Sequence, residues 1–210
     1  MQSVRNVARR VLNHLRLALP LVPEEARGAA AHLVEIEEVV VRRARAAFAR
    51  RTGAARMRYH GNLHLGQLLY TGRDFVILMS EGEAVRSLAD RRTKRSPLRD
   101  VAALLRSLHY ASAHAAVSGG SVRREDVPAL EPWAAYWRAW VSAAYLRGYL
   151  ASSPGSVFHP DDPQQLREAL DGYLLEKALQ ELSLELSLRP DWIRIPLRGI
   201  LQLVEGPPWG

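Results

Sequence analysis

The stretch His60-Gly61-Asn62-Leu63-His64-Leu65-Gly66-Gln67 decides the fold of this chain. It stands directly before two short apolar bursts, Leu68–Tyr70 and Phe75–Leu78, which flank the turn Thr71-Gly72-Arg73-Asp74. Apolar bursts around a turn of this composition predict a small β-hairpin. The polar residues of 60–67 are therefore expected on a loop held by short strands, where a rigid scaffold commonly presents functional groups.

Most of the remaining sequence has the periodicity of helices. Apolar residues recur at helical spacing from Val4 to Leu19 and stop at Pro20. Pro23 is predicted to begin a second helix that Gly53 ends, and Asp162 with Pro163 is predicted to start a helix that ends before Pro190. The pattern predicts a mainly α (α+β) fold.

Aromatic residues form a stripe in the second half of the chain. Such a stripe at helical spacing is typical of core packing, and we expect these side chains in the core. Its members are Trp133, Tyr136, Trp137, Trp140, Tyr145 and Tyr149.

Length and composition limit the classes of protein. A chain of 210 residues with 48% apolar residues can bury one good core, and zero cysteines exclude disulfides and thiolate chemistry. No run of ~18 uncharged apolar residues is present, and Arg5, Arg9 and Arg10 interrupt the apolar positions near the start. We therefore expect a cytoplasmic protein with no membrane partner.

The net charge of +7 raises the question of a nucleic-acid partner. The basic cluster Arg42–Arg51 falls at the end of a predicted helix, where cations offset the helix dipole and solvate an outer face. No zinc-finger spacing accompanies it, and Phe48 is the one aromatic residue interleaved with its basic side chains, too few for a series of base-stacking positions. A nucleic-acid partner is not expected.

Residues 60–67 resemble the catalytic loop of kinases related to the aminoglycoside phosphotransferases. The wider resemblance is to maltokinase and to the maltokinase-like C-terminal region of fused trehalose synthases. It rests on the segments Ser3–Asn6, Tyr59–Gln67, Tyr70–Val76, Glu81–Glu83, Lys94–Ala102, Leu105–Ser107, Tyr110–Ala111, Leu175–Leu179 and Arg189–Leu197. The resemblance implies the C-terminal lobe of a protein-kinase-like, aminoglycoside-phosphotransferase-like fold, with the N-terminal lobe absent.

Two positions depart from the family pattern. Asn62 stands where the family has the Asp that takes up the proton of the acceptor hydroxyl, and Met79 stands where it has a metal-binding Asp. An amide cannot act as a base near neutral pH, and losing a positioned base typically lowers the rate by ~10²–10⁴. Mg²⁺ prefers oxygen ligands to a thioether, and Gln67, at the second metal position of the family, would hold it weakly alone.

Other loop residues have structural roles by the same resemblance. Asp100 corresponds to an acid that anchors the backbone of the catalytic loop, and His60 to a histidine that holds the turn. His60 and His64 are four residues apart, but the Glu and the helix of a zinc motif are missing. Glu81 and Glu83 match the family's turn after the metal position, so a glycosidase pair is not expected.

Four residues resemble the sugar side of the maltokinase cleft: Glu176, Lys177, Arg189 and Trp192. Charged and aromatic groups suit a disaccharide through hydrogen bonds and stacking. An ion-paired helix end beside a packed Trp explains the same residues equally well. Both interpretations stay open.

The sequence thus predicts one maltokinase-like C-lobe domain over 1–210. Within it we expect N-terminal helices (1–53), degenerate catalytic and metal loops (54–95) and a helical subdomain (96–210). The expected function is that of an inactive pseudokinase module with no cofactor, which stabilises or assembles a partner such as trehalose synthase, or weakly binds maltose or an α-glucan. The alternative is part of an active maltokinase that forms maltose 1-phosphate with ATP and Mg²⁺, its N-lobe supplied in trans.

Overall fold

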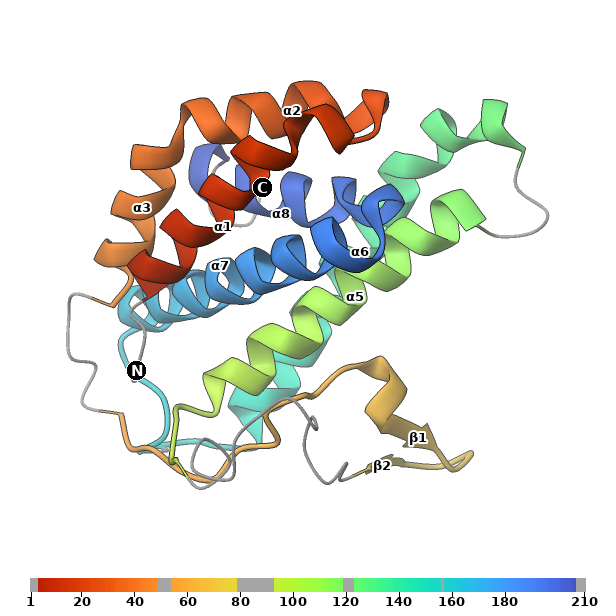
Figure 1. Ribbon diagram of the computed structural model, residues 1–210. Helices are drawn as coiled ribbons and strands as arrows, with labels where there is room; N and C mark the ends of the chain where they lie inside the picture. Colours follow the sequence, from red (N-terminus) through yellow and green to blue (C-terminus); the bar gives the residue numbers. More distant parts are fainter. Residues whose placement is uncertain (1–3, 49–53, 79–92, 119–122, 156, 207–210) are drawn as a thin grey trace. The chain divides into compact units, whose positions relative to one another are not determined.

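The computed structural model describes residues 4–48, 54–78, 93–118, 123–155 and 157–206. It is mainly helical with one two-stranded antiparallel sheet, which confirms the mainly α class and the small hairpin (Figure 1). The chain divides into two compact units. We call Met1–Thr52 with Asp162–Gly210 the helical unit, and Gly53–Asp161 the loop unit.

The described residues of the helical unit form five α-helices around one apolar core. They are α1 (Val4–Ala18), α2 (Glu24–Glu35), α3 (Glu37–Ala46), α7 (Pro163–Leu188) and α8 (Arg194–Glu205). The helix α1 buries Val11, Leu12 and Leu15 on one face, as its periodicity predicts, and ends before Pro20. Asp162 caps α7 by accepting a hydrogen bond from the Gln165 amide at 2.8 Å, so the predicted start of this helix is confirmed.

The prediction of one continuous helix after Pro23 is wrong, because the chain breaks at Ile36 between α2 and α3. Ile36 has φ −90° and ψ 19° and serves as the end of one helix and the start of the next. Glu37 and Glu38 lie in the first turn of α3, where carboxylates stabilise a helix N-terminus. This second acidic start within the apolar pattern is the sequence signal for the break.

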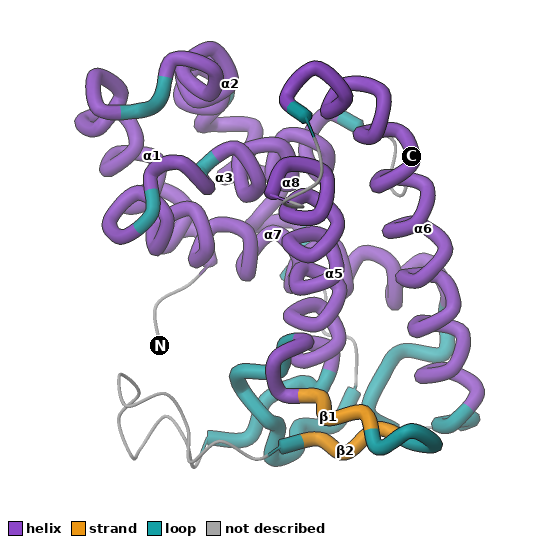
Figure 2. The backbone as a smooth tube through the Cα atoms, turned by 90° about the vertical axis from the view of Figure 1, so that its right-hand side faces the viewer, coloured by secondary structure: helices purple, strands orange, loops and turns teal. Residues whose placement is uncertain are grey.

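The loop unit contains the hairpin and two long helices, α5 (Leu98–Ser118) and α6 (Val127–Ala151), which pack on each other. The strands β1 (Leu68–Tyr70) and β2 (Phe75–Ile77) pair with Leu68 opposite Ile77 and Tyr70 opposite Phe75 (Figure 2). Gly72 has φ 90° in the turn between them, a conformation that glycine adopts readily. The hairpin thus extends the loop whose residues carry the candidate chemistry.

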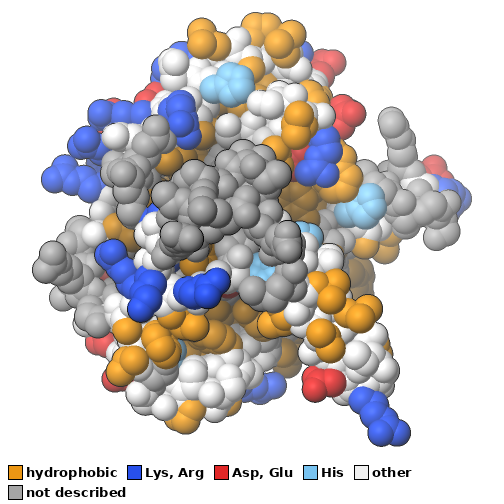
Figure 3. Space-filling model, turned by 60° about the horizontal axis from the view of Figure 1, so that its bottom comes forward, with side chains coloured by type: hydrophobic (Ala, Val, Ile, Leu, Met, Phe, Trp, Pro, Cys, Tyr) orange, Lys and Arg blue, Asp and Glu red, His pale blue; other side chains and the backbone are white. Residues whose placement is uncertain are grey.

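Four of the six aromatic residues expected in the core, Trp133, Tyr136, Trp137 and Trp140, are exposed, whereas Tyr145 and Tyr149 are half-buried. The helix α6 buries no residue among those described, and Trp133 is 70% and Trp140 61% exposed. Helical periodicity shows that side chains share a face, but it does not show whether anything covers that face. Figure 3 shows that hydrophobic side chains also occur on the face of the molecule drawn there.

Among the described residues, no helix is both long enough and apolar enough to cross a membrane.

Candidate functional site

The loop at residues 60–62 is held by a single carboxylate. Asp100, in the first turn of α5, accepts a hydrogen bond from the His60 amide at 2.6 Å and one from the Gly61 amide at 2.8 Å. Each carboxylate oxygen accepts one of the two bonds, and charge-assisted bonds of this kind are the stronger ones. Gly61 has φ 85°, which a side chain would disfavour, so the turn needs glycine there.

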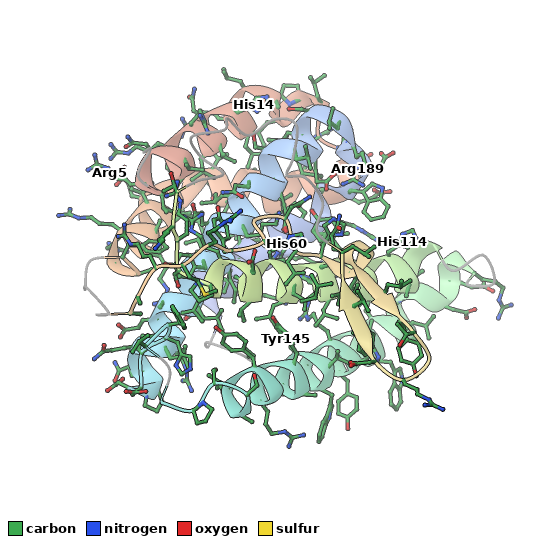
Figure 4. All side chains as sticks on the ribbon, turned by 90° about the horizontal axis from the view of Figure 1, so that it is seen from below. Arg5, His14, His60, His114, Tyr145 and Arg189 are labelled. Carbon is green, nitrogen blue, oxygen red and sulfur yellow. The ribbon has the colours of Figure 1, made fainter. Side chains whose placement is uncertain are left out.

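The His60 ring closes the same turn. Its Nε2 lies 2.8 Å from the Leu78 carbonyl oxygen, and its Nδ1 accepts a 3.3 Å hydrogen bond from the Asn62 amide. In this arrangement Nε2 is the donor and Nδ1 the acceptor, because the carbonyl can only accept and the amide can only donate. His60 therefore ties the loop to the end of the hairpin (Figure 4).

Asn62 occupies the position where the resemblance puts the catalytic base. Its backbone is fixed through His60, and the next residue, Leu63, is only 9% exposed. The Asn62 side chain is half-buried and makes no hydrogen bond to another described residue. The position is thus built with a defined backbone, and the group that it presents is an amide.

His64 and Gln67 shape the connection from the loop to the hairpin. His64 caps the 3₁₀ turn η2 (Leu65–Gln67), with Nδ1 accepting a 3.1 Å bond from the Gly66 amide. A Cβ on Gly66 would lie 2.9 Å from the His64 ring, so this cap requires glycine at 66. The Gln67 carbonyl accepts a 2.8 Å bond from the Leu78 amide and continues the pairing of β1 with β2.

The described residues do not offer a set of side chains that could ligate a metal ion. Within the described ranges, no group of three or more His, Asp and Glu residues could hold a metal ion. His64 already uses Nδ1 as a cap, and the His60 ring is bonded at both nitrogens. Met79, Glu81 and Glu83 lie outside the described residues.

Ser107 supports the loop from α5, a role that the sequence did not reveal. Its hydroxyl accepts a 3.0 Å hydrogen bond from the Leu65 amide, two turns of helix beyond Asp100. The two residues are seven apart and therefore lie on one face of α5. The spacing of these two residues on one face of α5 was the available signal.

Asp100 also affects two tyrosines of α6. Burial, the neighbouring Tyr149 and the negative charge of Asp100 together raise the pKa of Tyr145 to about 12. Tyr145 lies between α5 and α6 in Figure 4, and the pKa of Tyr149 is raised by burial and by Asp100. Both phenols therefore stay protonated at neutral pH and can donate hydrogen bonds.

The residues expected on the sugar side lie in the helical unit. Arg189 follows the last turn of α7 and donates two hydrogen bonds to Glu185, at 2.9 and 2.8 Å. Its guanidinium carbon lies 5.1 Å from the centroid of the Trp192 ring, in cation–π contact. Glu185 is 1% exposed and orients this pair through its two hydrogen bonds to Arg189. Glu185 was not identified from the sequence. The signal was its spacing of four residues to Arg189, which is usual for an ion pair on a helix.

Glu176 and Lys177 are separate from this arrangement. Glu176 is 8% exposed, Lys177 is half-buried, and nine residues of α7 separate Glu176 from Glu185. Nine residues of helix correspond to about 13.5 Å along the axis. Arg189 and Trp192 thus form one local group, and Glu176 lies some distance away on the same helix.

Comparison with known proteins identifies the fold. No protein-family model matches the chain. Glucosamine kinase in complex with glucosamine, ADP and inorganic phosphate is similar, with a TM-score of 0.66 and 18% identity over 96% of this chain and 44% of that one. Two further crystal forms of glucosamine kinase have 18% identity over 96% of this chain, with TM-scores of 0.66 and 0.61 and 46% and 44% of their own chains covered.

The chain therefore has a kinase-like fold and spans less than half the length of these kinases. Identity this low shows the fold alone. The coarser part of the predicted resemblance, a kinase-like fold, is confirmed. The maltokinase relationship and the assignment to one lobe stay predictions.

Proposed function

We propose that this chain is a catalytically inactive, maltokinase-like module of the kinase-like fold, a pseudokinase that acts through binding. The observation that carries the proposal is Asn62. The loop backbone around it is held by Asp100 and His60 as a positioned functional group would need. Phosphoryl transfer requires a residue that orients the hydroxyl and takes its proton, and an amide can do only the first.

The metal side of the reaction supports the same proposal. Phosphoryl transfer needs a divalent cation between the nucleotide phosphates. Met79 at the family's metal position offers a thioether, and Gln67 offers one neutral amide oxygen. Neither compensates the charge of Mg²⁺, so we propose that the chain binds no ATP or Mg²⁺.

Sugar binding is the property that this module retains in our proposal. The Arg189 guanidinium is oriented by Glu185 and stacks on Trp192, which leaves a charged donor beside an aromatic ring. Such a pair suits a sugar through hydrogen bonds and stacking. Maltose or an α-glucan is the proposed ligand, and trehalose synthase is the proposed partner. Glucosamine serves as the comparison sugar, because the similar structures are glucosamine kinases.

The alternative is part of an active maltokinase with an N-lobe supplied by another chain. It is favoured by one fact: each similar kinase is more than twice as long as the matched region. It requires that the other chain supply both a base and a metal site.

The experiment that separates these functions combines turnover with calorimetry. Purified chain is incubated with radiolabelled ATP, Mg²⁺ and maltose or glucosamine, and titrated with each sugar and with ADP-Mg²⁺. We expect no transfer, no nucleotide binding, and weak maltose binding that Arg189→Ala and Trp192→Ala abolish. Arg198→Ala and Trp133→Ala are the matched controls, exposed residues of the same types outside the Arg189 group.

Unaided phosphorylation of a sugar would refute the inactive module. Turnover only after an N-lobe protein is added would support the split kinase. Sugar binding unaffected by the Arg189 and Trp192 variants would remove the proposed binding group, whatever the result for catalysis.

A further inference from the structure

The helix α6 exposes four large aromatic side chains on one face, which we call the aromatic stripe. The exposed fractions are 70% for Trp133, 59% for Tyr136, 46% for Trp137 and 61% for Trp140. Scattered apolar residues are normal on a surface, but a contiguous exposed patch of this kind usually marks an interaction site. The side chains are consecutive in the i+3 and i+4 rows of one helix, so they form a single patch.

The opposite face of α6 is the one that packs on α5. Arg138 and Tyr149 are half-buried, and Tyr145 lies between the two helices in Figure 4. Twenty-five residues of α6 contain only three charged side chains, Glu131, Arg138 and Arg147. A helix so apolar on all sides is normally covered on all sides, and α5 covers only one.

The exposed face changes character along the helix. Beyond the aromatic stripe, the exposed positions of the same face are small, namely Ala143, Ala144 and Gly148, with Arg147 between them. A Cβ added to Gly148 would meet no atom within 4 Å, so the space beside it is open. One face thus carries large side chains at 133–140 and small ones at 143–148.

We propose that this face binds a second copy of the chain, with the two α6 helices antiparallel about a two-fold axis near residues 141 and 142. A two-fold interface sets the same patch of both copies against itself, so a patch must be self-complementary. Antiparallel pairing lays the aromatic half of each helix over the small half of the other. Large side chains then enter the grooves that small ones leave, as helix packing requires.

Arg147 fits the same arrangement. In the proposed register, Trp140 of one copy faces Ala143 of the other. In the same register, Arg147 of one copy faces Tyr136 of the other. A guanidinium over an aromatic face is a favourable contact that strengthens when water is excluded. Arg147 is exposed and has no ion-pair or hydrogen-bond partner among the described residues.

The area also suits a dimer. Large aromatic side chains present about 150–250 Å² each, so the four together expose roughly 500 Å², against about 800 Å² per partner in a standard interface. The alanines and Arg147 add to that area. A flat sugar ligand is disfavoured, because the ring planes of Trp133 and Tyr136 meet at 82° and those of Tyr136 and Trp140 at 61°.

Sedimentation over a wide range of concentrations tests the proposal on the full chain. We expect a monomer–dimer equilibrium that Trp140→Glu shifts to monomer. The control is Leu17→Glu, which changes an apolar residue of α1 that is also strongly exposed (73%) and should leave the dimer intact. Circular dichroism shows whether each variant keeps its helices. A chain that is monomeric at every concentration, or a dimer that Trp140→Glu leaves unchanged, overturns the proposal.

Two further variants test the packing itself. Ala144→Trp adds apolar surface but fills the groove beside the small residues of α6. The proposed self-complementary dimer should therefore become weaker. Unspecific hydrophobic association would instead become stronger. Because the chain has no cysteine, single-cysteine variants report the register. Ala143→Cys, near the proposed axis, should crosslink under oxidation, and Ala135→Cys, on an exposed position farther away, should not. The reverse crosslinking result, or tighter association of Ala144→Trp, overturns the antiparallel arrangement.

Discussion

The helical unit and the loop unit differ in what holds them together. In the helical unit, eighteen buried apolar residues from α1, α2, α3, α7, α8 and their connections form one contiguous cluster. In the loop unit, the described buried apolar residues are confined to α5 and Leu63. The helical unit is stabilised mainly by close packing, so removing side-chain volume from its core lowers the free energy of unfolding.

The loop unit instead places much of its apolar surface outside. Both strands of the hairpin expose apolar side chains, with Phe75 62% and Ile77 53% exposed, and α6 exposes the aromatic stripe. Its loop is held by polar contacts: Asp100 to two amides, His60 to the hairpin, and Ser107 to Leu65. An isolated two-stranded hairpin is only marginally stable, so such contacts matter more here than in the helical unit.

The difference teaches that the two units are held by different kinds of contact. The helical unit depends on a contiguous apolar core. The loop unit depends on hydrogen bonds that fix its loop, and it leaves apolar side chains of the hairpin and of α6 exposed.

The largest expected effect comes from the core of the helical unit. Leu179→Ala removes a side chain that is 0% exposed, and we expect a loss of about 2–5 kcal/mol in the free energy of unfolding. The matched change in the loop unit, Val76→Ala, truncates a side chain that is 48% exposed and should change the free energy by roughly 0.5 kcal/mol or less. Urea unfolding followed by circular dichroism measures both. Equal losses would remove the contrast between the units.

A medium effect is expected at the loop anchor. Asp100→Ala leaves the His60 and Gly61 amides without their acceptor. An amide that is removed from water and has no acceptor costs about 1–3 kcal/mol of stability, so we expect the loop to open more easily. Hydrogen exchange of these two amides should become roughly ten- to a hundredfold faster.

The control for the anchor is Asp162→Ala, which removes a comparable carboxylate-to-amide bond, at 2.8 Å, from the start of α7. It should destabilise that helix by about 1 kcal/mol and leave the His60 and Gly61 amides unchanged. Unchanged exchange in Asp100→Ala would show that the loop is held by other contacts.

The smallest effect is expected at the surface of the helical unit, where His32 of α2 lies 2.6 Å from Glu205 of α8. The hydrogen bond and the negative charge of Glu205, together with Glu35, raise the pKa of His32 above its ordinary value of 6.5. A group with a raised folded-state pKa stabilises the fold fully below the unfolded-state value and loses that contribution as pH rises through the folded-state value. The free energy of unfolding should therefore fall slightly as pH rises above 6.5.

His32→Gln should remove that pH dependence, and His14→Gln, an exposed histidine of α1, should retain it. Unfolding measured from pH 5.5 to 8.5 gives the comparison. Curves of the same shape for wild type and His32→Gln would contradict the proposed link between α2 and α8.

Local features of the chain were predictable from sequence. The hairpin followed from two apolar bursts around Thr71–Asp74, and the start of α7 from Asp162 and Pro163, because turns and caps depend on neighbouring residues. The kinase-like fold and the candidate roles of Asn62 and Asp100 came from a resemblance carried by those local segments. The break at Ile36 was missed because the apolar pattern continues across it.

Two properties were decided only in three dimensions. The periodicity of α6 fixes which aromatic residues share a face, but their exposure depends on what packs there, and α5 takes the opposite face. The two-oxygen contact of Asp100 with residues forty positions earlier is also a product of the fold. Sequence spacing determines neighbours within one element, whereas burial and long-range hydrogen bonds depend on how separate elements come together.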